Sequence, residues 1–431
     1  FMTIYDVAIA GGGFSGLCAA VMLGRAGIGN VAIIDANKRI GKKILATGNG
    51  QGNLTNEDLA ISHYHGDTEF AKAVLSRFDR KNLLNFFGEI GLIASAKDGK
   101  IYPSNYCASS ILDVLRFAVE DNRTDVFTET KIVKAEKQNG VFRLSASDGR
   151  EFFAKNVVFA FGGSSGDGFS TDGSSFALAK SFGHTITDLA PSLVQIATER
   201  EKIRGLKGIK LQGAVTLFDG GKKIAAFSGD VLFTDYGISG NCVFALSAYL
   251  KGLKKPSVSI EFLPDKTAEE IKANFENKRK IAYLSSCERL LVSVLPSRLA
   301  LSVLSAAGLN PGSASDEKAI CAITKTLKNF TLKVEGTAGF KASQVTAGGV
   351  NCSEVNPENM ESRLRKNLFI IGEALDVDGD CGGYNLQWAY SSAAACAEYL
   401  ARAIKNADGG QPLRRNGKAA EKVTEKNEKN R

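Results

Sequence analysis

The sequence GGGFSG, which lies between an apolar run and a helical pattern, constrains the fold of this chain more than any other feature. Residues 7–10 are apolar and predict a short buried parallel strand. The glycines have the spacing G-x-G-x-x-G, and residues 15–26 form a helix-like stretch with Gly27 in the C-cap position. A second β-branched run, residues 31–34, ends at Asp35. This order of strand, glycines, helix, strand and acid predicts a βαβ unit that binds a dinucleotide.

Each part of this unit has a physical role in binding a dinucleotide. Gly11 permits a tight turn, Gly13 lets backbone N–H groups approach a pyrophosphate, and Gly16 lets the helix pack closely against the strand. The helix N-terminus supplies unpaired N–H donors and the positive end of a dipole for the phosphates. The carboxylate of Asp35 can accept hydrogen bonds from both hydroxyls of an adenosine ribose. A glycine-rich turn that binds nothing is the alternative, and the complete order of elements disfavours it.

A second strand-to-helix turn lies near the C-terminus. The apolar run 368–371 is followed by GEALDVDGDCGG, and a long helix is expected to begin near Tyr384 or Asn385. Its N-terminus would lie beyond the carboxyl end of a strand, where open α/β sheets bind ligands. Two such helices suit a flavin dinucleotide, with its pyrophosphate at the first and its isoalloxazine pyrimidine edge at the second. A positive dipole end there would stabilise the anionic reduced flavin. A calcium loop, the alternative for the acidic turn, would need a different spacing and a terminal Glu.

Composition and length describe an ordinary globular protein of two or three domains, with 431 residues, 44% hydrophobic and 23% charged. The formal net charge of +8 is spread out, without a basic stripe or interleaved aromatic residues, so we expect no nucleic-acid partner. No apolar run is long enough for a membrane span. Eight scattered cysteines and three histidines give no metal-ligand spacing, so we expect no metal and a reducing, cytoplasmic location. The oligomeric state is left open.

Between the N-terminal glycine turn and the C-terminal strand-to-helix turn, the hydrophobic pattern of the sequence changes. Residues 192–262 alternate in the manner of short strands, and residues 267–328 have helical periodicity. A change of this kind in the middle of an α/β chain indicates an insertion.

The motifs GGGFSG, GKKILATGNGQGNLTN, TAGGV and GEALDVDGDCGGYNLQWA together resemble those of the BaiN-like flavoproteins, over residues 5–403. These FAD-dependent NAD(P)H oxidoreductases are related to aminoacetone oxidases and to an enone reductase of bile-acid metabolism. The chain departs from the family pattern at Gln51, Gly52, Asp235 and Asn241. The resemblance implies an α/β fold with a Rossmann-like FAD-binding domain of the glutathione-reductase type. The resemblance implies an FAD-binding domain formed by residues 1–190 and 341–405. It further implies a β-barrel-like insertion formed by residues 191–265 and 326–340, a helical subdomain at residues 266–325, and a disordered charged tail at residues 406–431.

The resemblance also assigns residues to FAD. The first glycines would hold the pyrophosphate, Asp35 the ribose and the backbone of Val133 the adenine. Residues 372–373 would meet the ribityl chain, and residues 383–386 the isoalloxazine. The residues implied to bind FAD are Gly11, Gly13, Phe14, Ser15, Gly16, Asp35, Lys43, Asn49, Gly50, Asn53, Val133, Gly162, Gly372, Glu373, Gly383, Tyr384, Asn385 and Leu386.

We therefore expect a reaction in which reduced FAD delivers hydride from N5 to an activated C=C bond of an apolar small molecule. An enone of the steroid or bile-acid kind is the favoured substrate, and NADH or NADPH the donor. The candidate proton donors are Tyr384, Cys381 and Tyr102. The absence of a C-x-x-x-x-C motif argues against a disulfide reductase. Two alternatives stay open, an oxidase that passes electrons from a small amine to oxygen and a flavin-binding protein without turnover.

Overall fold

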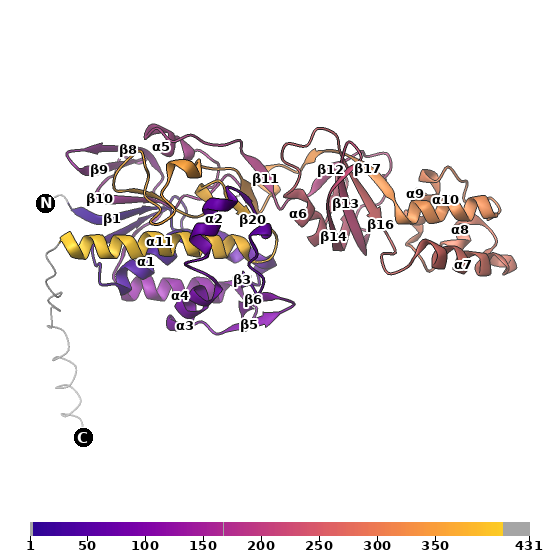
Figure 1. Ribbon diagram of the computed structural model, residues 1–431, viewed down its shortest axis with the longest axis horizontal. Coiled ribbons are helices and arrows are strands. Elements are labelled where there is room, and N and C mark those ends of the chain that lie inside the picture. The colour runs from indigo at the N-terminus through magenta and orange to yellow at the C-terminus, as the bar shows by residue number, and fades with distance from the viewer. Residues whose placement is uncertain (1–2, 167, 408–431) are drawn as a thin grey trace, which may run out of the picture.

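The computed structural model describes residues 3–166 and 168–407 and has an elongated shape (Figure 1). An α/β domain lies at one end, a closed β-barrel in the middle, and a group of helices at the other end. The predicted fold class, α/β with an inserted barrel and a helical part, is confirmed.

The α/β domain is built on a seven-stranded sheet with the order β7-β2-β1-β10-β9-β8, in which β19 also pairs with β10. Its strands are β1 (Ile4–Ala10), β2 (Val31–Ile34), β7 (Asp125–Phe127), β8 (Ile132–Gln138), β9 (Val141–Ala146), β10 (Glu151–Phe159) and β19 (Leu368–Ile370). Strand β1 has a parallel neighbour on each side, and its Val7, Ala8 and Ile9 are fully buried. Strands buried on both faces have continuous apolar sequences, which is why β1 could be predicted.

Two long helices pack along each other although they come from opposite ends of the chain (Figure 1). They are α1 (Phe14–Arg25) and α11 (Tyr384–Ala407). Strands β1 and β19 are both parallel to β10, so their carboxyl ends lie at the same edge of the sheet. Both helices therefore begin beyond that edge. The other helices of the domain are α2 (Thr68–Leu75), α3 (Arg80–Glu89), α4 (Ala108–Asp121) and α5 (Phe176–Ser181).

Short sheets surround this edge. They are formed by β3 (Thr55–Asn56), β5 (Ala94–Lys97) and β6 (Lys100–Pro103), by β4 (Tyr64–Gly66) with β20 (Val377–Gly379), and by β11 (Ala190–Ser192) with β18 (Val345–Ala347). The chain leaves the α/β domain along β11 and returns to it along β18, and these two strands pair. We propose residues 191–340 as the inserted unit.

The barrel closes in the order β12-β15-β14-β13-β16-β17, with antiparallel pairing throughout. Its strands are β12 (Ile196–Thr198), β13 (Lys210–Asp219), β14 (Lys222–Phe233), β15 (Gly237–Ser239), β16 (Pro256–Glu261) and β17 (Phe330–Thr337). Alternate residues such as Val215 and Leu217 are fully buried inside it, as expected for strands with one buried face. Helix α6 (Asn241–Ser247) packs against β14 on the side of the α/β domain.

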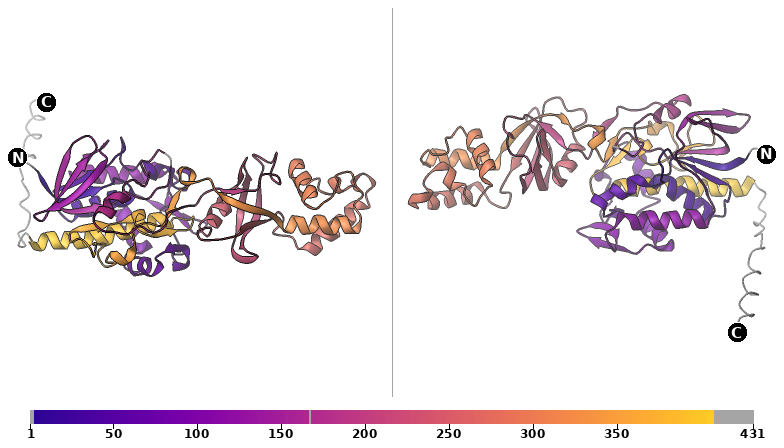
Figure 2. Two further views of the ribbon diagram at one scale, coloured as in Figure 1. Left: turned by 90° about the horizontal axis from the view of Figure 1, so that it is seen from above. Right: turned by 180° about the vertical axis from the view of Figure 1, so that it is seen from behind.

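The far end consists of α7 (Ala268–Arg279), α8 (Cys287–Leu290), α9 (Ser297–Ala306) and α10 (Glu317–Lys328) (Figure 2). Thr267 begins α7 with a capping box to Glu270, and Asp316 caps α10. The helices and the barrel share one hydrophobic core, which is separate from the core of the α/β domain.

Within residues 3–166 and 168–407, no helix has both the length and the apolar character needed to cross a membrane. Helix α11 includes the first two residues of the predicted charged tail 406–431, and the rest of that tail lies outside the described residues.

Candidate active site

The glycine turn between β1 and α1 leaves no room for side chains at two of its positions. A Cβ on Gly11, whose φ is +115°, would lie 2.3 Å from the backbone oxygen of Ala160. A Cβ on Gly16 would lie 2.0 Å from the backbone oxygen of Gly11. At Gly13, by contrast, the described residues place no heavy atom beyond its chain neighbours within 4 Å of a Cβ. Gly11 and Gly16 therefore permit close packing, and Gly13 leaves the first turn of α1 open.

The start of α1 has the properties of an anion site. Among the described residues, no side chain caps it at Gly13, and its first turn contains no acidic residue. Free N–H groups and the positive end of the helix dipole therefore face the open space beside this turn. A pyrophosphate fits such a helix start.

Asp35 is buried behind the glycine turn. Its Oδ2 accepts a hydrogen bond of 2.6 Å from the backbone N–H of Gly12. Its Oδ1 accepts bonds of 2.7 and 3.0 Å from the backbone and side-chain nitrogens of Asn37. A carboxylate has about four acceptor positions, so these three bonds leave room for one hydroxyl donor. Asp35 thus also fixes the turn itself, a role that the sequence did not indicate.

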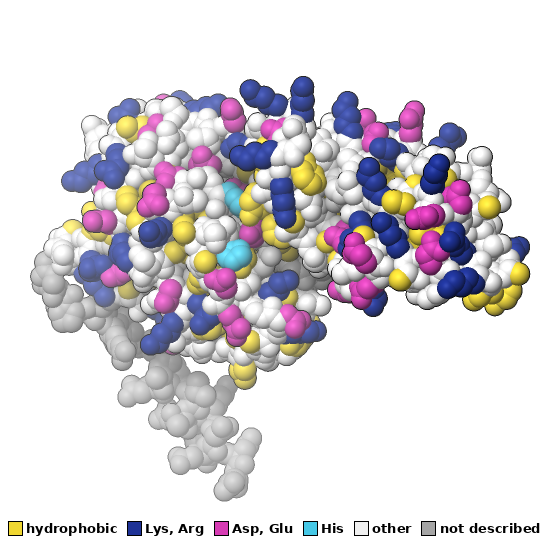
Figure 3. Space-filling view, turned by 45° about the vertical axis from the view of Figure 1, so that its right-hand side comes forward, with side chains coloured by type: hydrophobic (Ala, Val, Ile, Leu, Met, Phe, Trp, Pro, Cys, Tyr) yellow, Lys and Arg dark blue, Asp and Glu magenta, His cyan; other side chains and the backbone are white. Residues whose placement is uncertain are grey.

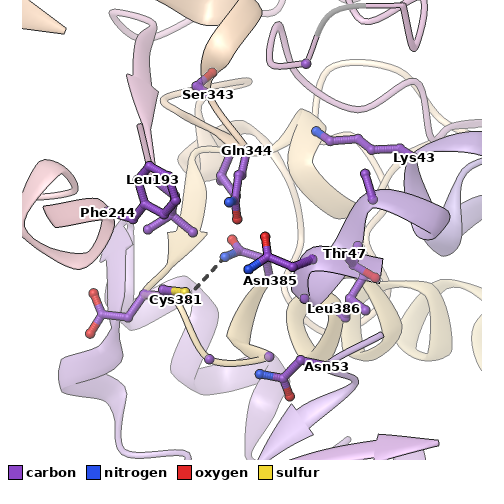
Figure 4. A pocket seen from close by; sticks show the side chains of 18 of the residues that line it. Lys43, Thr47, Asn53, Leu193, Phe244, Ser343, Gln344, Cys381, Asn385 and Leu386 are labelled. Atoms are coloured by element: carbon purple, nitrogen blue, oxygen red, sulfur yellow. Dashed lines mark hydrogen bonds between the residues drawn. The ribbon is translucent and has the colours of Figure 1, made fainter. Parts of the chain in front are cut away.

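A cavity of about 640 Å³ lies between the α/β domain and the barrel (Figure 4). It extends from the start of α1 to the start of α11, so the two helix N-termini meet one space. The predicted residues that line it are Phe14, Ser15, Lys43, Asn49, Asn53, Gly162, Glu373, Cys381, Gly383, Asn385 and Leu386.

The other predicted residues lie around this cavity without lining it. They are Gly11, Gly13, Gly16, Asp35, Gly50, Tyr102, Val133, Gly372 and Tyr384. Gly372 packs against α1, because a Cβ on it would lie 2.6 Å from Ser15 Oγ. Val133 falls at an irregularity in the β8–β9 register, and its side chain is exposed.

An ion pair joins the two chain segments that border the cavity. Lys43 Nζ lies 2.8 Å from Glu373 Oε2, and both side chains are less than a third exposed. Glu373 Oε1 also accepts a hydrogen bond of 2.9 Å from the backbone N–H of Thr346. These contacts attach the 3₁₀ segment η1 (Lys42–Gly50) to the C-terminal part of the chain.

The loop before α11 lies close to the backbone of β3 and has its own internal hydrogen bonds. Gly383 has φ = +96°, and a Cβ on it would lie 2.6 Å from the backbone of Thr55. The side-chain amide of Asn385 donates to the oxygen of Gly379 at 2.8 Å and accepts from its N–H at 2.9 Å. The first turn of α11 contains no acidic residue. The positive dipole end of this second helix would therefore also favour a negative group.

Asn53 provides a separate indication of a bound polar group. Its Oδ1 is buried and has no hydrogen-bond partner among the described residues, and its side chain lies at the cavity (Figure 4). An unpaired buried amide oxygen costs about 1–3 kcal/mol, which a donor on a ligand would offset. The uncapped start of α1, the start of α11 at the same cavity and this oxygen fit FAD.

The three predicted proton donors lie in different places. Cys381 lines the cavity, and burial raises the pKa of its thiol. The ring of Tyr384 stacks on His63 at 4.6 Å between ring centroids, and burial raises its pKa. Tyr102 packs against Tyr106, and burial also raises its pKa. Of the three, Cys381 is the one that faces the cavity.

Sequence reasoning did not predict an apolar wall of the cavity, to which the insertion and β18 both contribute. The wall consists of Leu193, Leu232, Phe244 and Val345. Cys381 of the loop before α11 packs against it, and Figure 4 shows Leu193 and Phe244 beside Cys381. Gln344 lies among them with its amide directed toward the space. Leu193 and Gln344 lie in bends next to β11 and β18, and Leu232, Phe244 and Val345 lie in regular elements. None of them has a motif spacing, so no sequence signal marked them.

Comparison with known proteins agrees with this geometry. A family model described as HI0933-like protein Rossmann domain matches residues 5–399. The 3-dehydro-bile acid delta(4,6)-reductase of Clostridium scindens is 36% identical over 401 residues, which cover 90% of this chain and 96% of that protein. The ribosomal RNA dihydrouridine synthase of Escherichia coli is 30% identical over 410 residues, which cover 93% and 98%. Among solved structures, the open conformation of a flavocytochrome c3 fumarate reductase aligns over 93% of this chain and 78% of its own, with 15% identity and a TM-score of 0.49.

The fold and the cavity define the class, an FAD-dependent oxidoreductase with a Rossmann-type domain. The chain belongs to the HI0933-like family, since the family model covers most of it and both relatives align along nearly its whole length. The family resemblance predicted from the motifs is confirmed.

Proposed function

We propose that this enzyme reduces a carbon–carbon double bond conjugated to a carbonyl group, with NADH or NADPH as the electron donor. Bound FAD supplies the hydride. The relative from Clostridium scindens is named as a reductase of a 3-dehydro-bile acid, and that from Escherichia coli as a dihydrouridine synthase. Dihydrouridine is uridine with its 5,6 double bond reduced, next to a carbonyl. The two names therefore share this reaction type.

The apolar wall of the cavity is the observation that supports an enone of the steroid or bile-acid kind. Leu193, Leu232, Phe244 and Val345 line the cavity and offer an apolar surface to a planar hydrocarbon. A flat apolar ring between this wall and the isoalloxazine would bury its faces and exclude water from the reacting atoms.

The acidic residues of the cavity argue against a small amine as substrate. Asp230 pairs with Lys210 at 2.9 Å, and Glu373 pairs with Lys43 at 2.8 Å. Asp380 contacts two histidines, at 3.0 and 2.9 Å. Each acidic residue in the described lining thus already has a partner, which leaves a substrate ammonium without a free carboxylate.

Uridine in RNA is a second candidate, and the distribution of charge favours it. Residues 191–340 contain 21 Lys and Arg against 14 Asp and Glu, so this segment carries most of the net charge of +8. Lys and Arg side chains lie over the barrel and the helices in Figure 3. Phosphate groups are attracted by such a surface. Our expectation of no nucleic-acid partner rested on a net charge described as spread out, without a basic stripe or interleaved aromatic residues, whereas this count assigns most of that charge to one segment.

Anaerobic spectroscopy of the purified protein tests the proposal. NADH or NADPH should bleach the flavin absorbance, and a 4-en-3-one steroid or an unmodified ribosomal RNA should then restore it, with two hydrogens added to the product. Restoration by the steroid or by the RNA distinguishes the two substrates. Bleaching by a small amine instead, with return of colour in oxygen, would identify an oxidase. A flavin that is reduced by dithionite and by no biological donor would indicate a protein without turnover.

A further inference from the structure

A cluster of one aspartate and two histidines adjoins the cavity and has no part in the site described so far. Asp380 is buried and lines the cavity. Its Oδ2 lies 3.0 Å from His63 Nδ1, and its Oδ1 lies 2.9 Å from His65 Nε2. His63 ends the 3₁₀ segment η2 (Ile61–His63) and His65 lies in β4, and both side chains reach the same carboxylate. The chain contains three histidines, and one carboxylate therefore holds two of them.

The cluster connects the cavity with solvent. The side chain of Asp380 is 8% exposed, whereas that of His63 is 31% exposed, and His63 Nε2 lies 3.3 Å from Asp58 at the surface. Histidine side chains are visible at the surface where the α/β domain meets the barrel (Figure 3). A proton can thus be exchanged with water at one end of the cluster, while the other end borders the cavity.

Charged neighbours favour protonation of His65. Burial lowers the pKa of His65, but its hydrogen bond to Asp380 and the charges of Asp378 and Asp380 outweigh burial and raise that pKa. Burial raises the pKa of Asp378 to about 6, against the charge of His65. Asp378 Oδ2 is buried without a hydrogen-bond partner among the described residues. The charges around His65 therefore favour a bound proton at this place.

The titratable and charged groups around the cluster come from several elements. They are Asp58, Tyr64, Lys100, Tyr249, Lys251, Asp376, Cys381 and Tyr384. Tyr249 meets His65 edge to face at 4.9 Å between ring centroids. Within the described ranges, no group of His, Cys, Asp and Glu is arranged to hold a metal ion, so metal binding does not explain the cluster.

We propose that His63, Asp380 and His65 are the proton store of this active site, which gains a proton from water when the bound FAD is reduced and releases it to the product. Proton uptake from water requires only that FAD is bound and reduced, whereas proton release to a product rests on the proposed function. With the flavin bound in this cavity, its reduction would add negative charge near Asp380, which lines it. A nearby negative charge stabilises protonated histidines, so proton uptake follows from electrostatics.

The proton balance of the proposed reaction requires such a donor. Hydride transfer supplies two electrons and one proton to one carbon of the double bond, and the adjacent carbon needs a second proton. An N–H bond of His63 or His65 breaks as an O–H bond forms on Asp380. That O–H bond then breaks as the new C–H bond of the product forms. Water restores the proton on the exposed histidine. Asp380 is thus the catalytic residue, and the histidines reload it.

The proton count of flavin reduction tests the store without any substrate. Spectroelectrochemical titration of the holoenzyme between about pH 5.5 and 8.5 gives the protons bound per two electrons. We expect roughly two protons for the natural protein over part of this range, and roughly one for Asp380→Asn and for the double variant His63→Gln, His65→Gln. Asp148→Asn, an exposed aspartate paired with Arg150, is the matched control and should behave like the natural protein. Unchanged proton counts in both cluster variants would overturn the proposal.

Nuclear magnetic resonance titration of the three histidines covers the case in which a variant loses its cofactor. The His65 signal should titrate above the ordinary histidine range in the natural protein and lower in Asp380→Asn. An ordinary value in both would contradict the store.

Kinetics separate this inference from the proposed function. Reoxidation by the acceptor should slow by about 100-fold in Asp380→Asn, while reduction by NAD(P)H changes little. An equal loss in both steps would contradict proton release by Asp380. If the natural reduced enzyme reacts with neither acceptor, the proposed function fails, and the proton count alone then decides whether the store exists.

Discussion

The α/β domain and the inserted barrel contribute to the same cavity by different means. The α/β domain offers backbone groups at the starts of α1 and α11, and Gly13 leaves the first turn of α1 open. The barrel side offers side chains such as Leu193 and Phe244. Backbone geometry depends on a few positions and tolerates little change, whereas a wall of side chains can change in shape and polarity without loss of the fold. The cofactor should therefore depend on the first region and the acceptor on the second.

The largest effect is expected from Gly13→Val. The added side chain has room in the protein, but it would occupy the space in front of α1 that a pyrophosphate needs. We expect FAD binding at least ~100-fold weaker and a colourless purified protein of unchanged fold. Gly29→Val, at an exposed glycine that likewise has open space, is the control and should retain the yellow colour. Normal flavin content in Gly13→Val would contradict the assignment of cofactor binding to the backbone of the α/β domain.

A smaller effect is expected from Phe244→Ala in the apolar wall. Loss of one aromatic contact should lower kcat/KM for a steroid enone by roughly 10- to 50-fold, while FAD content and reduction by NAD(P)H stay normal. Tyr283→Ala, which removes an exposed ring among the distant helices, should leave all three unchanged. Loss of FAD from Phe244→Ala would show that the barrel also determines cofactor binding.

The ion pair across the cavity should have a moderate effect on stability. Lys43→Met leaves Glu373 partly buried without its cation, so we expect a loss of about 1–2 kcal/mol in the free energy of unfolding. Arg25→Met breaks a pair whose side chains are 42% and 60% exposed, and it should cost less than about 0.5 kcal/mol. Chemical denaturation of each variant gives the difference. Equal losses would mean that the cavity pair contributes no more than a surface pair.

The smallest effect is expected at Cys381. Because burial raises the pKa of its thiol, this group is protonated at neutral pH. Iodoacetamide should modify it at a more alkaline pH than the exposed Cys107 and Cys321. Cys381→Ala should reduce turnover by less than about threefold, as expected for a packing residue of the wall. A loss of 100-fold or more would instead make Cys381 a proton donor.

The parts of the site that could be predicted are those encoded locally. The spacing of glycines from Gly11 to Gly16 determines a turn within a few residues, and Asp35 follows one strand later. The assignment of individual residues to FAD stays a prediction, although many of them line the cavity.

The parts that could not be predicted depend on distant contacts. His63 and Asp380 are 317 residues apart, and their pairing arises from the β4–β20 ladder. The ring of Tyr384 stacks on His63, which comes from a distant part of the chain that the motif around Tyr384 does not include. The sequence also did not show that Asp35 would be occupied by Gly12 and Asn37.

The pairing of β11 with β18 has a consequence for how such enzymes diversify. Ser192 and Val345 are partners in that ladder, so the long excursion between them starts and finishes at one point in space. A different inserted domain could take the place of this one if its first and last residues lay as close together as two paired strands. Recombination at this junction could then exchange the acceptor-recognising half of the enzyme while the electron-carrying half is inherited intact.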